Sequence, residues 1–366
     1  MRVEGQLACR DLVVFVPGLM GSVLEREGEA LWRPSAGMAA RAFLSRGATI
    51  AALRLGADSP TDDDIGDGIK ATRLVDGVHM LPGLWKIDLY GPVLHNLRAR
   101  LELSEGVNYY EHPYDWRRDI RYAARTLARA IEPRLRAWRE RIGDPGAQVA
   151  MIAHSMGGLV ARYYLECLGG WVDTRSLITL GTPHRGAIKA LTSLANGMTM
   201  GVGPLQVDVG DFVKSCTCAT QFLPIWECYD GGDGVLRRPG ETSGIPGVDP
   251  ARAAAGLAFN REIQSAVETN RRDPRWEAEG YTLYPVVGTR QRTQVSARLD
   301  PSGKVIADDS IRGRQIDGDA TVSRISATPI ELSRAGREFF VATKHATLHN
   351  APEVLHHIEG VISGAT

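Results

Sequence analysis

The stretch V-A-M-I-A-H-S-M-G-G-L-V-A-R-Y-Y-L-E-C-L, residues 149–168, decides the fold prediction. Its first five residues form a continuous apolar run, which is typical of a strand buried on both faces. Residues 156–168 are expected to form a helix, so the chain must turn sharply at Ser155. Such a turn is crowded and needs small residues two places before and after it, here Ala153 and Gly157. The strand, turn and helix together predict a serine hydroxyl exposed for nucleophilic attack.

Strands and helices alternate on both sides of this stretch. Residues 12–16, L-V-V-F-V, form a second apolar run, and 118–141 carry an apolar stripe at helical spacing. The alternation predicts the α/β class, with a mostly parallel sheet and helices on both faces. Strands are expected at 12–16, 107–112, 149–153, 177–180, 281–287 and 339–342, a hairpin over 294–306, and helices over 90–101, 118–141, 156–168 and 352–362.

Two stretches interrupt the alternation. Residues 30–90 are rich in Gly and Pro and contain the acidic cluster Asp62, Asp63, Asp64 and Asp67, which we interpret as a solvated loop. Residues 187–259 are rich in Gly, Thr, Met and Pro and are expected to form a cap. The length of 366 residues fits one catalytic domain with insertions. The predicted core is therefore 1–29, 91–186 and 260–366, with an early insertion at 30–90 and a cap at 187–259.

Charge and hydropathy limit the classes of partner that the chain is expected to bind. The chain has 43 Lys and Arg against 43 Asp and Glu, so it has no global basic field to attract nucleic acid. Contact with a membrane would then depend on local apolar surface. The first apolar run, 12–16, is too short for a signal peptide, and no run has the length of a transmembrane helix. A cytoplasmic location is therefore expected.

The five cysteines are not expected to hold a metal. Cys216 and Cys218 lie near Cys228, but the spacing is no recognised zinc pattern and no histidine lies between them. An odd number of cysteines fits a reducing compartment, although Cys228 could bridge to Cys216 or Cys218 in an exported protein. Neither a metal nor another cofactor is expected.

A serine hydroxyl is a poor nucleophile unless a base activates it and donors stabilise the oxyanion that forms. If Ser155 is the nucleophile, the N–H of Met156 at the start of the next helix is one donor. The second donor is expected from the loop V-P-G-L-M-G-S (16–22), where we favour Leu19 over the neighbouring Met20. Met20 and His154 are expected to line the site and contact the substrate.

The acid and the base are expected to follow the nucleophile in that order. Asp319 in D-G-D-A-T-V (317–322) is favoured because it lies in a glycine-containing turn. His345 is favoured as the base because it follows a predicted strand and precedes the last helix; His349 stays open as an alternative. Three aspartates remain open for the acid: Asp308, Asp309 and Asp317.

These residues resemble the lecithin:cholesterol acyltransferase-like family of α/β-hydrolases, which includes lysosomal phospholipase A2. P-Y-D-W-R together with G-D-A-T-V is more specific to this family than the serine motif, which lipases share. The cysteines do not reproduce the family's disulfide pattern. The matching segments follow the family's order: V-P-G-L-M-G-S (16–22), P-G-L-W (82–85), P-Y-D-W-R (113–117), A-H-S-M-G-G (153–158), G-T-P-H-R-G (181–186), F-L-P (222–224) and G-D-A-T-V (318–322).

The resemblance implies an α/β-hydrolase fold with Ser155, Asp319 and His345 as the catalytic triad and Leu19 and Met156 as oxyanion donors. It further implies an early insertion that meets membrane, a cap over an acyl groove, and a structural role for P-Y-D-W-R. The expected function is a serine acyl hydrolase or acyltransferase with an acyl ester substrate and a transient lipid interface. The alternative is an intracellular esterase, lactonase or thioesterase for small or carrier-bound acyl groups. A non-enzymatic binding protein is a third hypothesis, which the complete set of three residues disfavours. The oligomeric state is not predicted.

Overall fold

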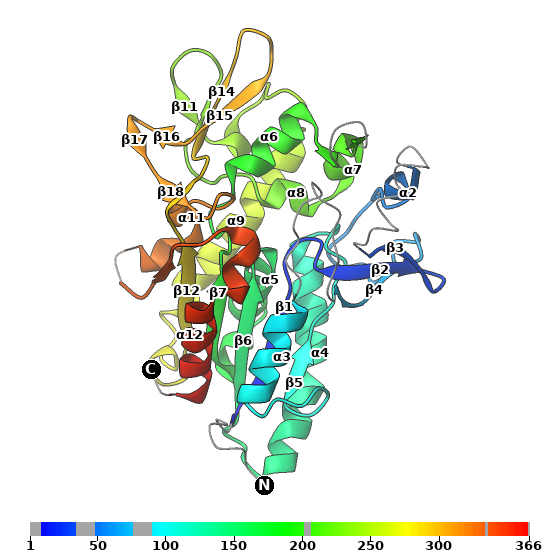
Figure 1. Ribbon diagram of the computed structural model, residues 1–366, viewed down its shortest axis with the longest axis vertical. Coiled ribbons are helices and arrows are strands. Elements are labelled where there is room, and N and C mark those ends of the chain that lie inside the picture. Colours follow the sequence, from blue (N-terminus) through cyan, green and yellow to red (C-terminus); the bar gives the residue numbers. More distant parts are fainter. Residues whose placement is uncertain (1–8, 34–47, 76–89, 201–205, 334–335, 365–366) are drawn as a thin grey trace.

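The computed structural model describes residues 9–33, 48–75, 90–200, 206–333 and 336–364 (Figure 1). A six-stranded sheet forms its centre, and every neighbouring pair of strands in it is parallel. Parallel strands end at one common edge, so the loops that follow them meet there. The order across the sheet is β19 (Phe339–Val341), β12 (Thr282–Gly288), β7 (Thr174–Leu180), β6 (Val149–His154), β1 (Leu12–Val16) and β5 (Tyr109–Glu111).

Both faces of the sheet are buried, as the apolar runs predict. In β1 the side chains of Leu12, Val14 and Val16 pack into one apolar cluster, whereas Val13 and Phe15 pack into another on the opposite face. Successive side chains of a strand point to opposite faces, so a strand covered on both sides needs apolar residues at every position. All five residues of β1 are buried.

Helices cover the two faces. On one lie α4 (Ile120–Ile142), α5 (Met156–Cys167) and α9 (Pro250–Asn270); on the other lie α3 (Gly91–Arg100) and α12 (Pro352–Ser363). The predicted α/β class and the two helical layers are therefore confirmed. Among the described residues, no helix is long and apolar enough to cross a bilayer.

The predicted elements of the core are found with small shifts at their ends. Strand β5 is shorter than the predicted 107–112, and β7 begins three residues before the predicted 177. The hairpin over 294–306 is confirmed as the antiparallel pair β14 (Ser296–Leu299) and β15 (Val305–Asp308). The apolar stripe predicted on α4 is buried along its length, and Asp119 caps this helix by accepting the N–H of Arg121.

The early insertion is more regular than we predicted from its composition. Its described part includes β3 (Glu29–Trp32) and β4 (Ile69–Leu74), which flank β2 (Ser22–Arg26) in an antiparallel sheet, and the short helix α2 (Ala48–Ala51). Leu24, Trp32 and Ile69 of these strands join the core cluster beside α4. The predicted motif P-G-L-W (82–85) lies outside the described residues.

The second insertion covers the edge of the central sheet where its strands end (Figure 1). It contains α6 (Ile188–Asn196), α7 (Gly210–Ser215) and α8 (Cys218–Gln221). Its strands β10 (Tyr229–Asp230) and β11 (Leu236–Arg237) continue the β14–β15 hairpin into a four-stranded sheet. The remaining elements are short: β8 (Thr199–Met200), β9 (Val207–Asp208), α10 (Trp276–Glu279), β13 (Gln291–Arg292), β16 (Ser310–Ile311), β17 (Arg314–Gln315), β18 (Asp317–Gly318) and α11 (Arg324–Ala327).

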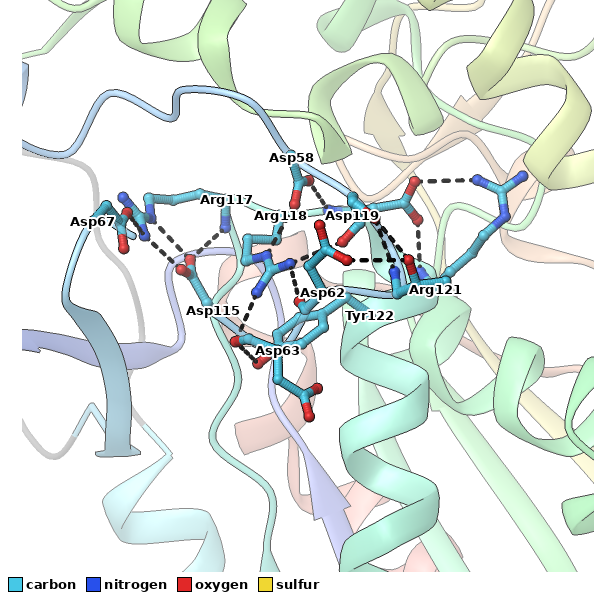
Figure 2. A network of polar contacts seen from close by, with 12 residues as sticks. Asp58, Asp62, Asp63, Asp67, Asp115, Arg117, Arg118, Asp119, Arg121 and Tyr122 are labelled. Atoms are coloured by element: carbon cyan, nitrogen blue, oxygen red, sulfur yellow. Dashed lines mark hydrogen bonds and ion pairs between the residues drawn. The ribbon is translucent and has the colours of Figure 1, made fainter. Parts of the chain in front are cut away.

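The acidic cluster of the early insertion is a solvated loop only in part, because Asp62, Asp63 and Asp64 are exposed whereas Asp67 is half-buried and pairs with Arg117. Figure 2 shows this segment lying against the P-Y-D-W-R motif and the start of α4. Arg117 is fully buried and pairs with Asp115 of its own motif and with Asp67 of the insertion. Arg118 is likewise buried and pairs with Asp58. Arg117 and Arg118 therefore hold the insertion against the core through ion pairs with Asp67 and Asp58.

All five cysteines lie in the described part of the chain, and all are free thiols. Cys216, Cys218 and Cys228 are buried. Burial raises the pKa of the Cys216 thiol to about 12, so this side chain stays a protonated, apolar group at neutral pH. The bridge considered between Cys228 and Cys216 or Cys218 is not formed.

Candidate active site

Ser155 lies in the sharp turn that its sequence context predicts. It separates β6 from α5 with φ 51° and ψ −120°, a backbone conformation that non-glycine residues rarely adopt. Its N–H donates to the carbonyl of Leu180 in the neighbouring strand at 2.9 Å. Conformational strain of this kind costs about 1–3 kcal/mol and is characteristic of functional turns.

The glycines of A-H-S-M-G-G are required by the close approach of other segments. A Cβ atom on Gly157 would lie 2.3 Å from the carbonyl oxygen of Val16, at the end of β1. A Cβ atom on Gly158 would lie 1.9 Å from Oγ1 of Thr182 in the G-T-P-H-R-G motif. Ala153, on the other side of the turn, is fully buried. The three motifs are thus packed against one another around the turn.

The structure brings Ser155, His345 and Asp319 together at hydrogen-bond distance. Nε2 of His345 lies 3.0 Å from Oγ of Ser155, and Nδ1 lies 2.7 Å from Oδ2 of Asp319. The side chain of His345 is 16% exposed and that of Asp319 is 1% exposed, so the carboxylate is sheltered behind the imidazole. This arrangement is the one in which a histidine takes the serine proton and a carboxylate fixes its tautomer. The catalytic roles of the three residues stay predictions.

The turn D-A-T-V holds Asp319 in place. Oδ1 accepts the N–H groups of Thr321 at 2.9 Å and Val322 at 2.6 Å, which leaves Oδ2 for His345. The backbone joins the same two residues, because the N–H of His345 donates to the carbonyl of Asp319 at 2.8 Å. Gly181 makes room beneath them, since a Cβ there would lie 2.9 Å from Oδ2.

The other candidate acids have different partners. Asp317 accepts the N–H of Arg290 through Oδ2, Asp308 accepts the N–H of Ser310, and Asp309 pairs with Arg292. Within the described residues, no hydrogen bond or ion pair joins any of the three to His345. The geometry therefore favours Asp319, as we predicted.

Two further histidines lie behind the predicted base. The ring of His154 is 5.2 Å from that of His345 and 4.8 Å from that of His349, measured between centroids. His349, the alternative base, is fully buried, whereas His345 faces Ser155. Burial, with contributions from His349 and His345, holds the pKa of His154 well below its usual value. His154 is thus a neutral, buried side chain; a contact with substrate stays a prediction for it.

The loop after β1 is positioned for the predicted oxyanion donors. Leu19 is 37% exposed at its tip, while Met20 is buried and has a positive φ of 64°. Across the described residues, the N–H groups of Leu19 and Met156 donate to no protein acceptor, which leaves them available to a ligand. Aromatic side chains hold the loop: Trp32 donates to the carbonyl of Met20, Trp116 to that of Ser22 and Tyr114 to that of Pro17. The role of Met20 in substrate binding stays a prediction.

Sequence reasoning missed Tyr90, which it placed only at the start of a predicted helix. The hydroxyl of Tyr90 lies 2.8 Å from the backbone nitrogen of Gly18 and 2.9 Å from Nδ1 of His154. Nothing in the sequence around Tyr90 marks it, because its partners lie 72 and 64 residues away.

Buried neutral histidines predict that the fold loses stability in mild acid. Burial lowers the pKa of His112 to about 4 and those of His154 and His184 well below 6.5. As the pH falls below 6.5 the unfolded chain binds protons at these three sites, whereas the folded chain binds none until the pH reaches the lowered pKa values, about 4 for His112, so stability falls as the pH falls. We expect the free energy of unfolding to drop by roughly 3 kcal/mol between pH 6 and 5.

Urea denaturation at both pH values measures this drop. The imidazole of His112 packs against the rings of Tyr110 and Tyr114. His112→Phe keeps a ring at this position and removes one titrating group. The drop should shrink by about a third in this variant. Equal free energies of unfolding at pH 6 and pH 5 in the parent chain would contradict the prediction.

The parallel central sheet with helices on both faces, at whose carboxyl edge Ser155, His345 and Asp319 meet, is the fold of an α/β-hydrolase. A chain of the crystal structure of the Tle4–Tli4 complex has this fold in common, with a TM-score of 0.65 at 14% identity over 96% of this chain and 97% of that one. At such low identity the likeness concerns the fold alone. It confirms the predicted fold class.

The predicted resemblance to the lecithin:cholesterol acyltransferase-like family is confirmed by two matches. The family model described as lecithin:cholesterol acyltransferase matches residues 96–244. The human protein "Lysosomal phospholipase A and acyltransferase" is 29% identical over 162 residues, 38% of this chain and 37% of the human protein. The aligned part thus spans little more than a third of that relative. Both matches support the predicted class of enzyme, a carboxylic ester hydrolase or acyltransferase.

Proposed function

We propose that this chain is a serine acyl hydrolase or acyltransferase that acts through an acyl-enzyme on Ser155. The observation that carries the proposal is the continuous hydrogen-bonded chain from Ser155 Oγ through His345 to the buried carboxylate of Asp319. The strained turn at Ser155 supports it, because such strain is uncommon outside functional positions.

The reaction follows from these positions. Oγ of Ser155 attacks the carbonyl carbon of an ester while Nε2 of His345 takes its proton. Asp319 keeps the proton of the imidazole on Nδ1 and stabilises the imidazolium that forms. The negative oxygen of the tetrahedral intermediate is stabilised by the N–H groups of Leu19 and Met156. His345 then protonates the leaving alcohol, and water or a second alcohol resolves the acyl-enzyme.

Lipid esters are the substrate class that we propose. The family match and the human relative, whose name includes phospholipase A and acyltransferase, support this choice. Exposed Leu19 beside the nucleophile offers an apolar contact for an acyl chain at a lipid surface. No part of the proposal requires a cofactor.

A fluorophosphonate probe and two ester substrates test the proposal. The probe should label Ser155, located by peptide mass spectrometry, and the label should be absent after heat denaturation. Hydrolysis of p-nitrophenyl palmitate should rise at least about tenfold on mixed micelles, whereas that of p-nitrophenyl acetate should not, because only the long ester is held at an interface. Failure to label Ser155 in active protein would contradict the mechanism. A preference for short dissolved esters, with no gain at micelles, would instead favour the small-ester alternative.

A further inference from the structure

Tyr90 bridges the loop after β1 and the last residue of β6, two neighbouring strands whose backbone pairing reaches Val16 and Ala153. It immediately precedes α3 and is buried, with its ring edge-on to Phe15 at 4.9 Å. Its hydroxyl meets Gly18, in the loop after β1, and His154, the last residue of β6. Leu19 lies in the loop that follows β1, and Met156 is the first residue of α5, which follows β6.

The direction of each hydrogen bond follows from the groups involved. The backbone N–H of Gly18 can only donate, so the hydroxyl oxygen of Tyr90 accepts there. The single hydroxyl proton can then be donated to Nδ1 of His154 when the imidazole carries its proton on Nε2. Burial holds the pKa of His154 well below its usual value, so the ring is neutral, as this hydrogen bond requires.

The two strand ends are in contact at this point. A Cβ atom on Gly18 would lie 3.0 Å from both Nδ1 of His154 and Cβ of Ser155. Leu19 follows Gly18 directly, and Met156 is two residues after His154. A change in the distance between Gly18 and His154 would therefore move one proposed oxyanion donor relative to the other.

We infer that Tyr90 is a positioning residue of the oxyanion hole, which its hydroxyl holds at a fixed width by bridging Gly18 and His154. The inference rests on the proposed function, since it needs an oxyanion to be stabilised. Donors stabilise an oxyanion only within a narrow range of distances, about 2.7–3.1 Å. Loosening the bridge should therefore weaken the transition state more than the bound substrate.

Tyr90→Phe tests the inference because it removes one oxygen and keeps the ring. We expect kcat for p-nitrophenyl butyrate to fall about 10–100-fold, less than the loss of a whole donor, with KM changed less than about twofold. The inhibition constant of a trifluoromethyl ketone, which forms a tetrahedral oxyanion on serine, should rise by the same factor as kcat falls.

Tyr109→Phe is the matched control. Tyr109 is buried in the same apolar cluster as Tyr90, but its hydroxyl bonds to Glu111, away from the turn at Ser155. Both variants lose one buried hydroxyl, so a general loss of stability would affect both. Only Tyr90→Phe should change the ratio between ketone affinity and KM.

A double-mutant cycle with His154→Leu tests the bridge itself. Because the hydroxyl acts through His154, the double variant should be no slower than the slower single variant. Additive losses would overturn the inference, as would wild-type kcat and ketone affinity in Tyr90→Phe. If Tyr90→Phe does not fold, His154→Leu alone decides, and an unchanged ketone affinity overturns the inference. A wild-type chain that neither reacts with fluorophosphonate nor hydrolyses esters would overturn the proposed function, and the inference with it.

Discussion

Replacement of Ser155 by alanine is expected to lower kcat for p-nitrophenyl butyrate by about 10⁴–10⁶-fold. The loss is large because His345 and Asp319 have no nucleophile to activate once Oγ is gone, and the remaining N–H groups stabilise an attacking water only weakly. The fold should be retained, since Ser155 makes no side-chain cap for α5 and loses a single hydrogen bond. Initial rates and a urea denaturation curve measure the two effects.

The control for this variant is Ser265→Ala. Ser265 is exposed on α9, far along the chain from the three residues of the site. It should keep wild-type rates and fluorophosphonate labelling, whereas Ser155→Ala should lose both. Rates within about tenfold of the parent in Ser155→Ala would exclude an acyl-enzyme on this residue.

Asp319→Asn is expected to lower kcat by about 10⁴-fold with little change in the backbone. An amide can present its NH₂ group to Nδ1 of His345, which then becomes an acceptor and leaves its proton on Nε2. In that tautomer the imidazole cannot take the proton of Ser155. The backbone bond from His345 N–H to the Asp319 carbonyl is independent of the side chain and should hold the loop.

Asp317→Asn provides the comparison, because Asp317 lies two residues away and accepts the N–H of Arg290 instead of facing His345. Its kcat should stay within about threefold of the parent. Rates and fluorophosphonate labelling kinetics should be measured for both variants. If Asp317→Asn is the slower of the two variants, Asp317 and not Asp319 is the acid.

The core strands and the residues Ser155, His345 and Asp319 could be predicted from the sequence because local patterns mark them. Burial on both faces gives β1 and β6 unbroken apolar runs, and the small residues Ala153 and Gly157 mark the turn at Ser155 within five residues of sequence. His345 and Asp319 could be selected by chain order and turn composition. Their meeting with Ser155, however, depends on the register of β19 and β12, which no local pattern encodes.

The missed features all depend on partners distant in the sequence. An aspartate in a polar, glycine-rich segment has the composition of a solvated loop, so nothing near Asp67 indicates that it faces the buried guanidinium of Arg117. Tyr90 could not be predicted for the same reason, since its partners Gly18 and His154 are distant in the sequence. Tertiary partners of polar residues are therefore the part of this site that local patterns left out.

The arginine contacts also make the early insertion a poor candidate for modular exchange. Deleting it, or replacing it with a loop that lacks Asp58 and Asp67, would leave the guanidinium groups of Arg117 and Arg118 beside too few carboxylates. An uncompensated buried charge costs about 3–5 kcal/mol, a large share of the stability of a typical domain. The same excision would take away Trp32, which holds the carbonyl of Met20. The early insertion therefore also stabilises the core. Redesign of the substrate range is better directed at individual side chains than at replacement of this whole insertion.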